Sequence, residues 1–289
     1  MRRAEILAFH THPAGLTSAG GQAPLFDGLP RDLGALVRIV QGLLIHEHIA
    51  EAYGVTLTVA QVADVHIRPV ERMLERITAQ DPQPLAVARP PANRLACCCR
   101  HVTLLLVAML RSQGVPARAR CGFGAYFFAG KFVDHWVCEY WNAAQERWVL
   151  VDAQIDARQR DLFNIELDTL DVPRDRFLVA GDAWTLCRTG KADAEAFGVL
   201  DMHGLWFIAS NVIRDVAALN NREMLPWDVW GAMALSDDAV PTGLIDRLAA
   251  LTKTPDESFG ELRAVYERDE SLRVPPTVFN AVLNCSDAV

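Results

Sequence analysis

The sequence predicts an α+β fold in which a buried helix is followed by a run of strands. Residues 99–111 are apolar nearly all round, which indicates a helix enclosed by the rest of the protein. Gly114 follows in the usual position for ending a helix. Short turn sequences then separate three strand-like segments at 117–128, 132–141 and 147–151. Helices and strands that are segregated along the chain favour α+β organisation, here with an antiparallel meander.

The segment before this central block carries helical patterns. A helix opens at Asp32, with apolar residues on one face, and Gly54 is placed to end it. A second helical pattern begins at Thr58, and Pro69 should divide it. Residues 80–95 contain four prolines and predict a connecting loop.

The segment after the central block turns helical again beyond Asp171. Helix-spaced apolar residues recur at 207–220, 241–252 and 259–270. The stretch 210–230 is dense in polar groups. It is interpreted either as a wall of a substrate cleft or as a network of hydrogen bonds and ion pairs between helices.

Composition and charge exclude several classes of protein. The chain has 289 residues, of which 51% are apolar and 22% charged, as in ordinary globular proteins. Its net charge is −8, and it has no block of Lys and Arg with which to neutralise phosphates. Its most apolar stretch, 102–110, is far shorter than the ~20 residues of a membrane span, and the N-terminus lacks a secretory apolar region. We expect a cytoplasmic protein with neither nucleic acid nor membrane as a partner.

The seven cysteines do not form a recognisable disulfide or zinc framework. Their number is odd, three of them are consecutive at residues 97–99, and no C-x-x-C pair occurs. We expect reduced thiols, because free cysteine is one of the most frequently buried residues in cytosolic proteins.

Three residues in the central block suggest nucleophilic chemistry. Cys99 stands at the expected start of the buried helix, where unpaired N–H groups and the helix dipole favour a thiolate. His135 lies in the second predicted strand, and Asp152 directly follows the third. If these strands are neighbours, the imidazole and the carboxylate lie side by side with the helix packed over them. A thiolate, an imidazole and an orienting carboxylate form an acyl-transfer site.

The same block resembles a known family. CRHVTLLLVAMLRSQGVPARARCGF, DHWVCEYW and RWVLVDAQ are similar to the core of the transglutaminase-like superfamily, over residues 94–156. The resemblance implies a papain-like α+β fold with a Cys at the head of the core helix, a His on one strand and an Asp after the next. It places these roles at Cys99, His135 and Asp152. Many members have a small residue before the nucleophile, whereas this chain has Cys98 there.

The resemblance also implies a domain organisation and a reaction. We expect an N-terminal helical flank (1–90), a transglutaminase-like catalytic core (91–170) and a C-terminal helical region (171–289), packed as one globular unit of bacterial type. The implied reaction is acyl transfer or amide hydrolysis through a thioacyl intermediate, on a peptide, protein or small amide. No acidic calcium loop is recognisable, so we expect no metal and no cofactor. The acceptor, water or an amine, and the oligomeric state stay open.

Alternatives remain for individual residues of this site. Cys98 is the reserve nucleophile, since a shift of one residue rotates a helical side chain by ~100°. Asp156 is the reserve carboxylate. Gln154 is interpreted either as a donor to the oxyanion or the imidazole, or as a plain loop amide.

Two other classes of function also remain open. One is a non-catalytic peptide-binding or scaffold protein that retains the fold. The other is a metal-dependent amidohydrolase, because two H-x-H pairs occur, His10 with His12 and His46 with His48.

Overall fold

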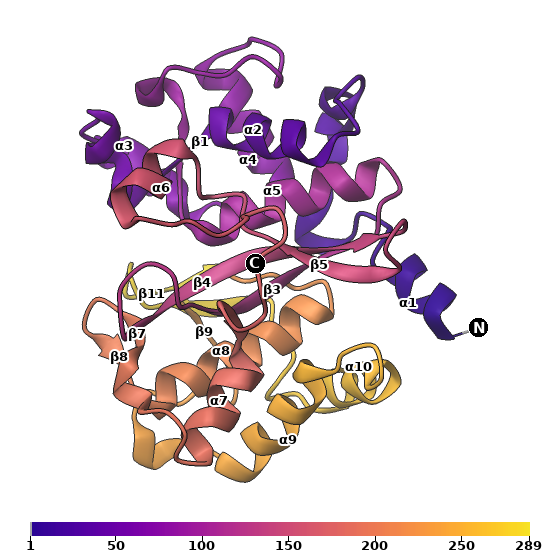
Figure 1. Cartoon of the computed structure of the whole chain (residues 1–289), viewed down its shortest axis with the longest axis vertical. Helices are drawn as coiled ribbons and strands as arrows, with labels where there is room; N and C mark the ends of the chain where they lie inside the picture. The colour runs from indigo at the N-terminus through magenta and orange to yellow at the C-terminus, as the bar shows by residue number, and fades with distance from the viewer. Residues whose placement is uncertain (1) are drawn as a thin grey trace. The chain divides into compact units, whose positions relative to one another are not determined.

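The computed structural model describes residues 2–289 and combines helices with sheets, which confirms the predicted α+β class (Figure 1). The chain divides into two compact units. The first unit contains the residues up to Ala119 together with Val137–Val172, and the second contains Arg120–Trp136 and Pro173–Val289. The predicted three-part division along the chain stays a prediction.

The strands form sheets of two, three and six strands. The order in the largest sheet is β6-β3-β4-β7-β8, with β5 paired to β4. The strands of this sheet are β3 (Ala117–Gly124), β4 (Phe132–Asn142), β5 (Arg147–Val151), β6 (Phe177–Val179), β7 (Phe197–Val199) and β8 (Met202–His203). The antiparallel pairing of β4 with β5 sets Cys138 opposite Val151. The three strands predicted in the central block are therefore present, and β3 and β4 each run through both units.

The first unit is built around α5 (Cys99–Ser112), whose residues from Cys99 to Arg111 are all buried. This is the enclosed helix that the sequence predicts, and Gly114 follows it with φ +77°. Helix α5 packs against α2 and α4. The other helices of this unit are α1 (Arg2–Phe9), α2 (Leu33–Leu43), α3 (Val59–Val62), α4 (Val70–Gln80) and α6 (Ala157–Phe163).

The helix predicted from Asp32 to Gly54 is shorter in the structure. Asp32 caps α2, because its side chain accepts a hydrogen bond from Ala35 N–H at 2.8 Å. The helix ends at Leu43, and β1 (Leu44–His46) follows, in parallel pairing with β2 (Leu95–Cys97). Pairing with a distant strand overrides the local helical pattern there. A 3₁₀ segment continues to Tyr53, and Gly54 ends it with φ +74°.

The second unit contains a helical layer and the remaining strands. Helices α7 (Ala180–Arg188), α8 (Leu205–Leu219) and α9 (Thr242–Lys253) pack on one another, and α10 (Phe259–Arg268) packs on α9. Strands β9 (Asp228–Val229), β10 (Thr277–Asn280) and β11 (Cys285–Ala288) form the three-stranded sheet. The sequence patterns located α8, α9 and α10 and did not indicate α7.

The polar stretch at 210–230 forms hydrogen bonds within the second unit. Arg214 donates to Asn211 Oδ1 at 2.9 Å, and Asn211 donates to Asp134 Oδ1 at 2.6 Å. Asp215 accepts two hydrogen bonds from the guanidinium of Arg120, at 3.1 and 2.9 Å. These contacts join α8 to β3 and β4 inside the unit.

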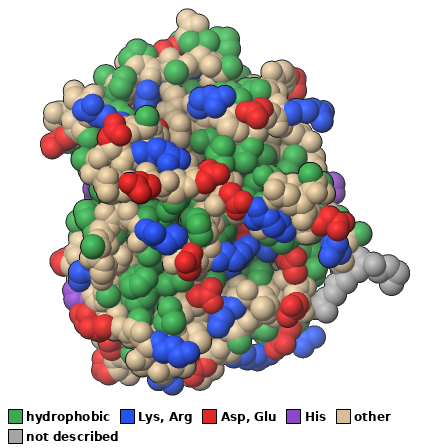
Figure 2. All heavy atoms as spheres, in the orientation of Figure 1, with side chains coloured by type: hydrophobic (Ala, Val, Ile, Leu, Met, Phe, Trp, Pro, Cys, Tyr) green, Lys and Arg blue, Asp and Glu red, His purple; other side chains and the backbone are tan. Residues whose placement is uncertain are grey.

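No helix within residues 2–289 combines the length and the apolar character that crossing a bilayer requires. On the face that Figure 2 shows, basic and acidic side chains are interspersed.

Candidate active site

Cys99 is the first residue of α5, as the sequence predicts. Strand β2 ends at Cys97, so that only Cys98 separates the strand from the helix. The extended backbone of Cys98, with φ −109° and ψ 176°, turns the chain into α5. The Cys99 side chain therefore lies at the first helical turn, whose backbone N–H groups have no partners within the helix.

Cys98 pairs with an imidazole one turn further along the helix. His101 Nε2 lies 2.8 Å from the carbonyl oxygen of Ile67, which can only accept, so Nε2 carries a proton. When the imidazole is neutral, His101 Nδ1 accepts from Cys98 N–H at 3.3 Å; when the imidazole is protonated, Nδ1 donates to Cys98 Sγ, 3.2 Å away. Burial opposes ionisation, but the hydrogen bond from Cys99 and the charge of His101 outweigh it and hold the pKa of the Cys98 thiol well below its usual value.

Asp152 directly follows β5, as the sequence predicts, and belongs to the same unit as Cys99. Its side chain is buried, and Oδ1 accepts from Gln154 N–H at 3.0 Å. Its own N–H donates to the carbonyl of Thr169 at 2.8 Å. These bonds fix the loop that starts at Asp152, and with it the position of the carboxylate.

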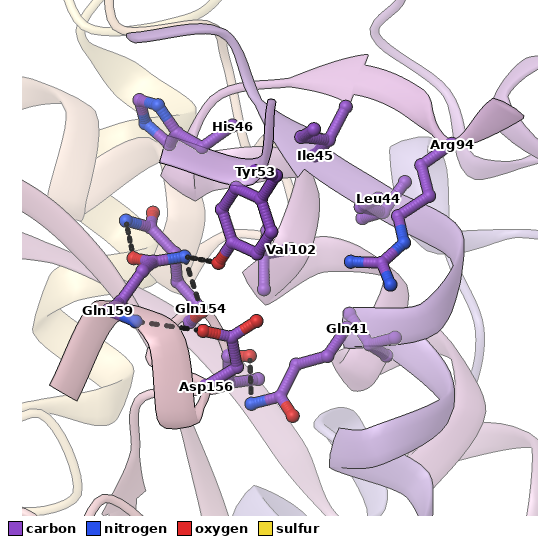
Figure 3. Close-up of a pocket in the computed structure, with 12 residues that line it drawn as sticks. Gln41, Leu44, Ile45, His46, Tyr53, Arg94, Val102, Gln154, Asp156 and Gln159 are labelled. Atoms are coloured by element: carbon purple, nitrogen blue, oxygen red, sulfur yellow. Dashed lines mark hydrogen bonds between the residues drawn. The ribbon is translucent and has the colours of Figure 1, made fainter. Parts of the chain in front are cut away.

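A pocket in the first unit is lined by near neighbours of Cys99 and Asp152 in the chain (Figure 3). Val102 lines it, and Val102 is on the same face of α5 as Cys99, one turn away. Ala153 and Gln154, the two residues after Asp152, also line it. The remaining wall residues come from α2, β1, the 3₁₀ segment, Arg94 and α6: Val40, Gln41, Leu44, Ile45, His46, Tyr53, Arg94, Asp156 and Gln159.

One wall of the pocket is a connected hydrogen-bond network. Gln159 Nε2 donates to the backbone carbonyl of Gln154 at 3.0 Å and to Tyr53 Oη at 3.1 Å. Gln154 Nε2 donates to Gln159 Oε1 at 3.1 Å. Asp156 caps α6 by accepting from Gln159 N–H at 3.0 Å. Burial and the neighbouring Asp156 raise the pKa of Tyr53. This network occupies both candidates that the sequence left open, Gln154 and Asp156.

His135 lies on β4, in the part of the strand that belongs to the second unit. Its side chain is buried within that unit among aromatic rings, with its centroid 5.0 Å from that of Phe127 and 6.4 Å from that of Phe177. The preceding residue, Asp134, accepts from Asn211. Adjacent residues of a strand point to opposite faces of the sheet, so the side chains of Asp134 and His135 lie in different environments.

The two H-x-H pairs differ from each other in their surroundings. His10 is buried with its ring edge-on to Trp148, at 5.8 Å between centroids, whereas His12 is exposed. His46 Nδ1 accepts from His48 N–H at 3.3 Å. Within residues 2–289 no group of three or more His, Cys, Asp or Glu side chains is placed to hold a metal ion.

Residues 72–153 match the model of the transglutaminase-like superfamily. The matched segment holds α5 with Cys99, the whole of β3, β4 and β5, and Asp152. The chain fits this superfamily. Within the matched segment, α5 begins at Cys99 and its last residues open the motif LRSQGVPAR.

A solved structure also shows similarity to the chain. It is a protein from Cytophaga hutchinsonii that is named as a putative cysteine protease, and it is 16% identical with a TM-score of 0.31. The similarity covers 52% of this chain and 42% of that protein, so the chain spans less than half of its length. No curated protein sequence matches the chain.

The sequence did not indicate most of the residues that line the pocket. The sequence predicts that Arg94 lies in a Pro-rich loop and that Tyr53 lies in a helix. Their spacing carries no signal, because they reach the pocket only through the pairing of β1 with β2. A buried amide such as Gln154, next to a candidate catalytic carboxylate, was the one available signal for this wall.

Proposed function

We propose that the chain is a thiol-dependent enzyme of the transglutaminase-like superfamily, with Cys99 as nucleophile, His135 as acid–base and Asp152 as the carboxylate that orients it. The proposal requires His135 to come within hydrogen-bonding distance of Cys99 Sγ and of Asp152. The observation that carries it is the position of Cys99 as the first residue of a buried helix inside the matched segment.

In the proposed reaction the Cys99 thiolate attacks the carbonyl carbon of an amide. The tetrahedral oxyanion is held by backbone N–H groups of the first turn of α5. The His135 imidazolium protonates the leaving amine, and Asp152 stabilises the imidazolium and fixes its tautomer. The thioacyl group then passes to water, which completes hydrolysis, or to an amine, which completes transamidation.

Cys98 is the rival thiol within this proposal. Its low pKa and its contact with His101 favour it, whereas Cys99 occupies the first position of α5. Cys99 also matches the position that the superfamily motif assigns to the nucleophile. We therefore assign the reaction to Cys99 and a supporting position to Cys98.

The test is the rate of iodoacetamide labelling as a function of pH. Trypsin releases all three consecutive cysteines on one peptide, Leu95–Arg100, so peptide mass alone cannot assign the label. We therefore compare Cys98→Ser with Cys99→Ser. Cys99→Ser should remove the fast phase, and Cys98→Ser should keep it. His135→Gln should move the midpoint of the fast phase to higher pH, because the imidazolium that stabilises the thiolate is lost.

Two results would contradict the proposal. A fast phase that survives in Cys99→Ser and vanishes in Cys98→Ser would assign the activated thiol to Cys98. A wild-type protein in which neither thiol reacts faster than exposed Cys285 would leave a binding protein that retains the fold.

A further inference from the structure

We propose that the pocket lined by Val102, Arg94 and Gln154 binds a substrate carboxylate through Arg94 and a substrate N–H through Gln154. This inference rests on the proposed function, because it names the substrate of the same site. The substrate class is a peptide that carries a free carboxylate close to the amide that Cys99 attacks.

The acceptor in this pocket is the side-chain oxygen of Gln154. The backbone carbonyl of Gln154 can only accept, so it fixes the amide of Gln159 with Nε2 toward it. Gln159 Oε1 must then accept from Gln154 Nε2, which fixes the second amide as well. Gln154 is 7% exposed, and its Oε1 has no hydrogen-bond partner in residues 2–289. A buried amide oxygen without a donor is costly in a folded protein, and a ligand N–H would satisfy it.

The donor group in this pocket is the guanidinium of Arg94. Its Nε donates to the carbonyl of Arg89 at 3.0 Å, which anchors the side chain. The guanidinium carbon lies 5.9 Å from the centroid of the Tyr53 ring. Neither terminal nitrogen has a hydrogen-bond partner in the part of the chain that the structure describes, and Figure 3 shows the guanidinium pointing into the pocket. The planar fork of Arg matches a carboxylate with two parallel hydrogen bonds.

The pocket also has an acidic side, which gives a bound ligand a direction. Asp156 lies across the pocket from Arg94 and accepts from Gln159 N–H. A carboxylate is repelled there and attracted to Arg94, whereas an N–H group is favoured beside Gln154 and Asp156. The N–H end of the ligand therefore lies at Gln154, whose backbone N–H donates to the proposed catalytic carboxylate of Asp152.

The test measures binding rather than turnover, on the full chain carrying Cys99→Ala. Ligand-observed NMR titrations give dissociation constants for three probes. These are N-acetyl-alanyl-alanine, its C-terminal carboxamide, and N-acetyl-aspartyl-alanine carboxamide. The first and third place the carboxylate at the chain end or on a side chain. We expect at least one acid to bind about tenfold more tightly than the neutral carboxamide, and the tighter acid identifies the source.

Variants of the pocket then assign this selectivity. Arg94→Gln should abolish the preference for an acid, and Arg94→Lys should retain part of it, because the charge stays and the fork is lost. Arg38→Gln is the matched control, since it removes the same charge from a side chain on α2 that is 72% exposed. Gln154→Leu should weaken the binding of all three probes, because it removes the amide oxygen that accepts the ligand N–H.

Three outcomes would overturn the inference. They are equal binding of acid and carboxamide, a preference that survives in Arg94→Gln, and binding of none of the probes. The proposed function can fail separately. If the wild-type protein has no fast labelling phase but the acid preference is intact, the catalytic assignment is refuted and the pocket remains a binding site.

Discussion

Replacing Glu47 with Gln should make the protein more stable at alkaline pH and not at acidic pH. Burial raises the pKa of Glu47 from 4.5 to about 7, and the negative charge of Cys98 adds to the rise. A carboxyl group with a raised pKa holds its proton more tightly in the folded state than in the unfolded state. The folded protein therefore loses stability as pH increases from about 4.5 to about 7, and Gln avoids this loss.

The size of the effect follows from the pKa difference. A rise of the pKa from 4.5 to about 7 corresponds to a loss of ~3 kcal/mol in the free energy of unfolding, before solvent screening is considered. The Glu47 side chain is only partly buried, and solvent screening reduces this to about 1–2 kcal/mol. Urea unfolding of wild type and Glu47→Gln at pH 5 and at pH 8 measures it. The free energy of unfolding of the variant, relative to that of the wild type, should be about 1–2 kcal/mol higher at pH 8 than at pH 5.

Glu51→Gln is the control for this comparison, because Glu51 is an exposed residue of the same 3₁₀ segment and loses the same charge. The reasoning is refuted if the difference between wild type and Glu47→Gln is the same at pH 5 and pH 8. It is also refuted if Glu51→Gln reproduces the full effect, since the cause would then be net charge rather than burial.

Three further substitutions test the packing of the units. Asp215→Asn leaves the buried guanidinium of Arg120 without its counter-charge and should lower the free energy of unfolding by about 3–5 kcal/mol in urea titrations. Asp32→Ala removes the cap of α2 and should cost about 1 kcal/mol, seen as a lower urea midpoint with an unchanged slope. Gly122→Ala would set a Cβ 2.1 Å from the carbonyl oxygen of Leu178, so β3 and β6 must separate. It should lower stability by about 1–3 kcal/mol, and an unchanged melting temperature would contradict the pairing.

The elements that the sequence predicted well are those whose stability is local. The helix at Cys99 is buried on every side and ends at a glycine, so composition alone marks its length. Pro69 divides the preceding helical pattern as expected, because its ring excludes a continuous helix. The short turns on either side of β4 were also predicted from the sequence.

The elements that the sequence did not predict depend on distant partners. Strand β1 interrupts a helical pattern only because Leu95–Cys97 lies alongside it, about fifty residues away. Strand β7 pairs in parallel with β4, with Phe132 opposite Phe197, and three residues give too short a pattern to recognise. The same dependence hid the pocket, because β1 and Arg94 meet there through the pairing of β1 with β2.

The three consecutive cysteines illustrate how one short motif yields three different thiols. Cys97 ends β2, fully buried beside β1, and burial raises its pKa well above the usual value. Cys98 turns the chain toward His101, where its pKa falls well below the usual value. Cys99 begins α5, beneath the positive end of the helix.

These differences arise because the chain passes from strand to helix within this single tripeptide. Successive side chains point to opposite faces in a strand and rotate by ~100° in a helix, so each thiol meets a different environment. Moving the strand end by one residue would exchange those environments. The pairing of His46 with Cys97 fixes that end, and so the register of β1 on β2 determines which of the three thiols begins the helix.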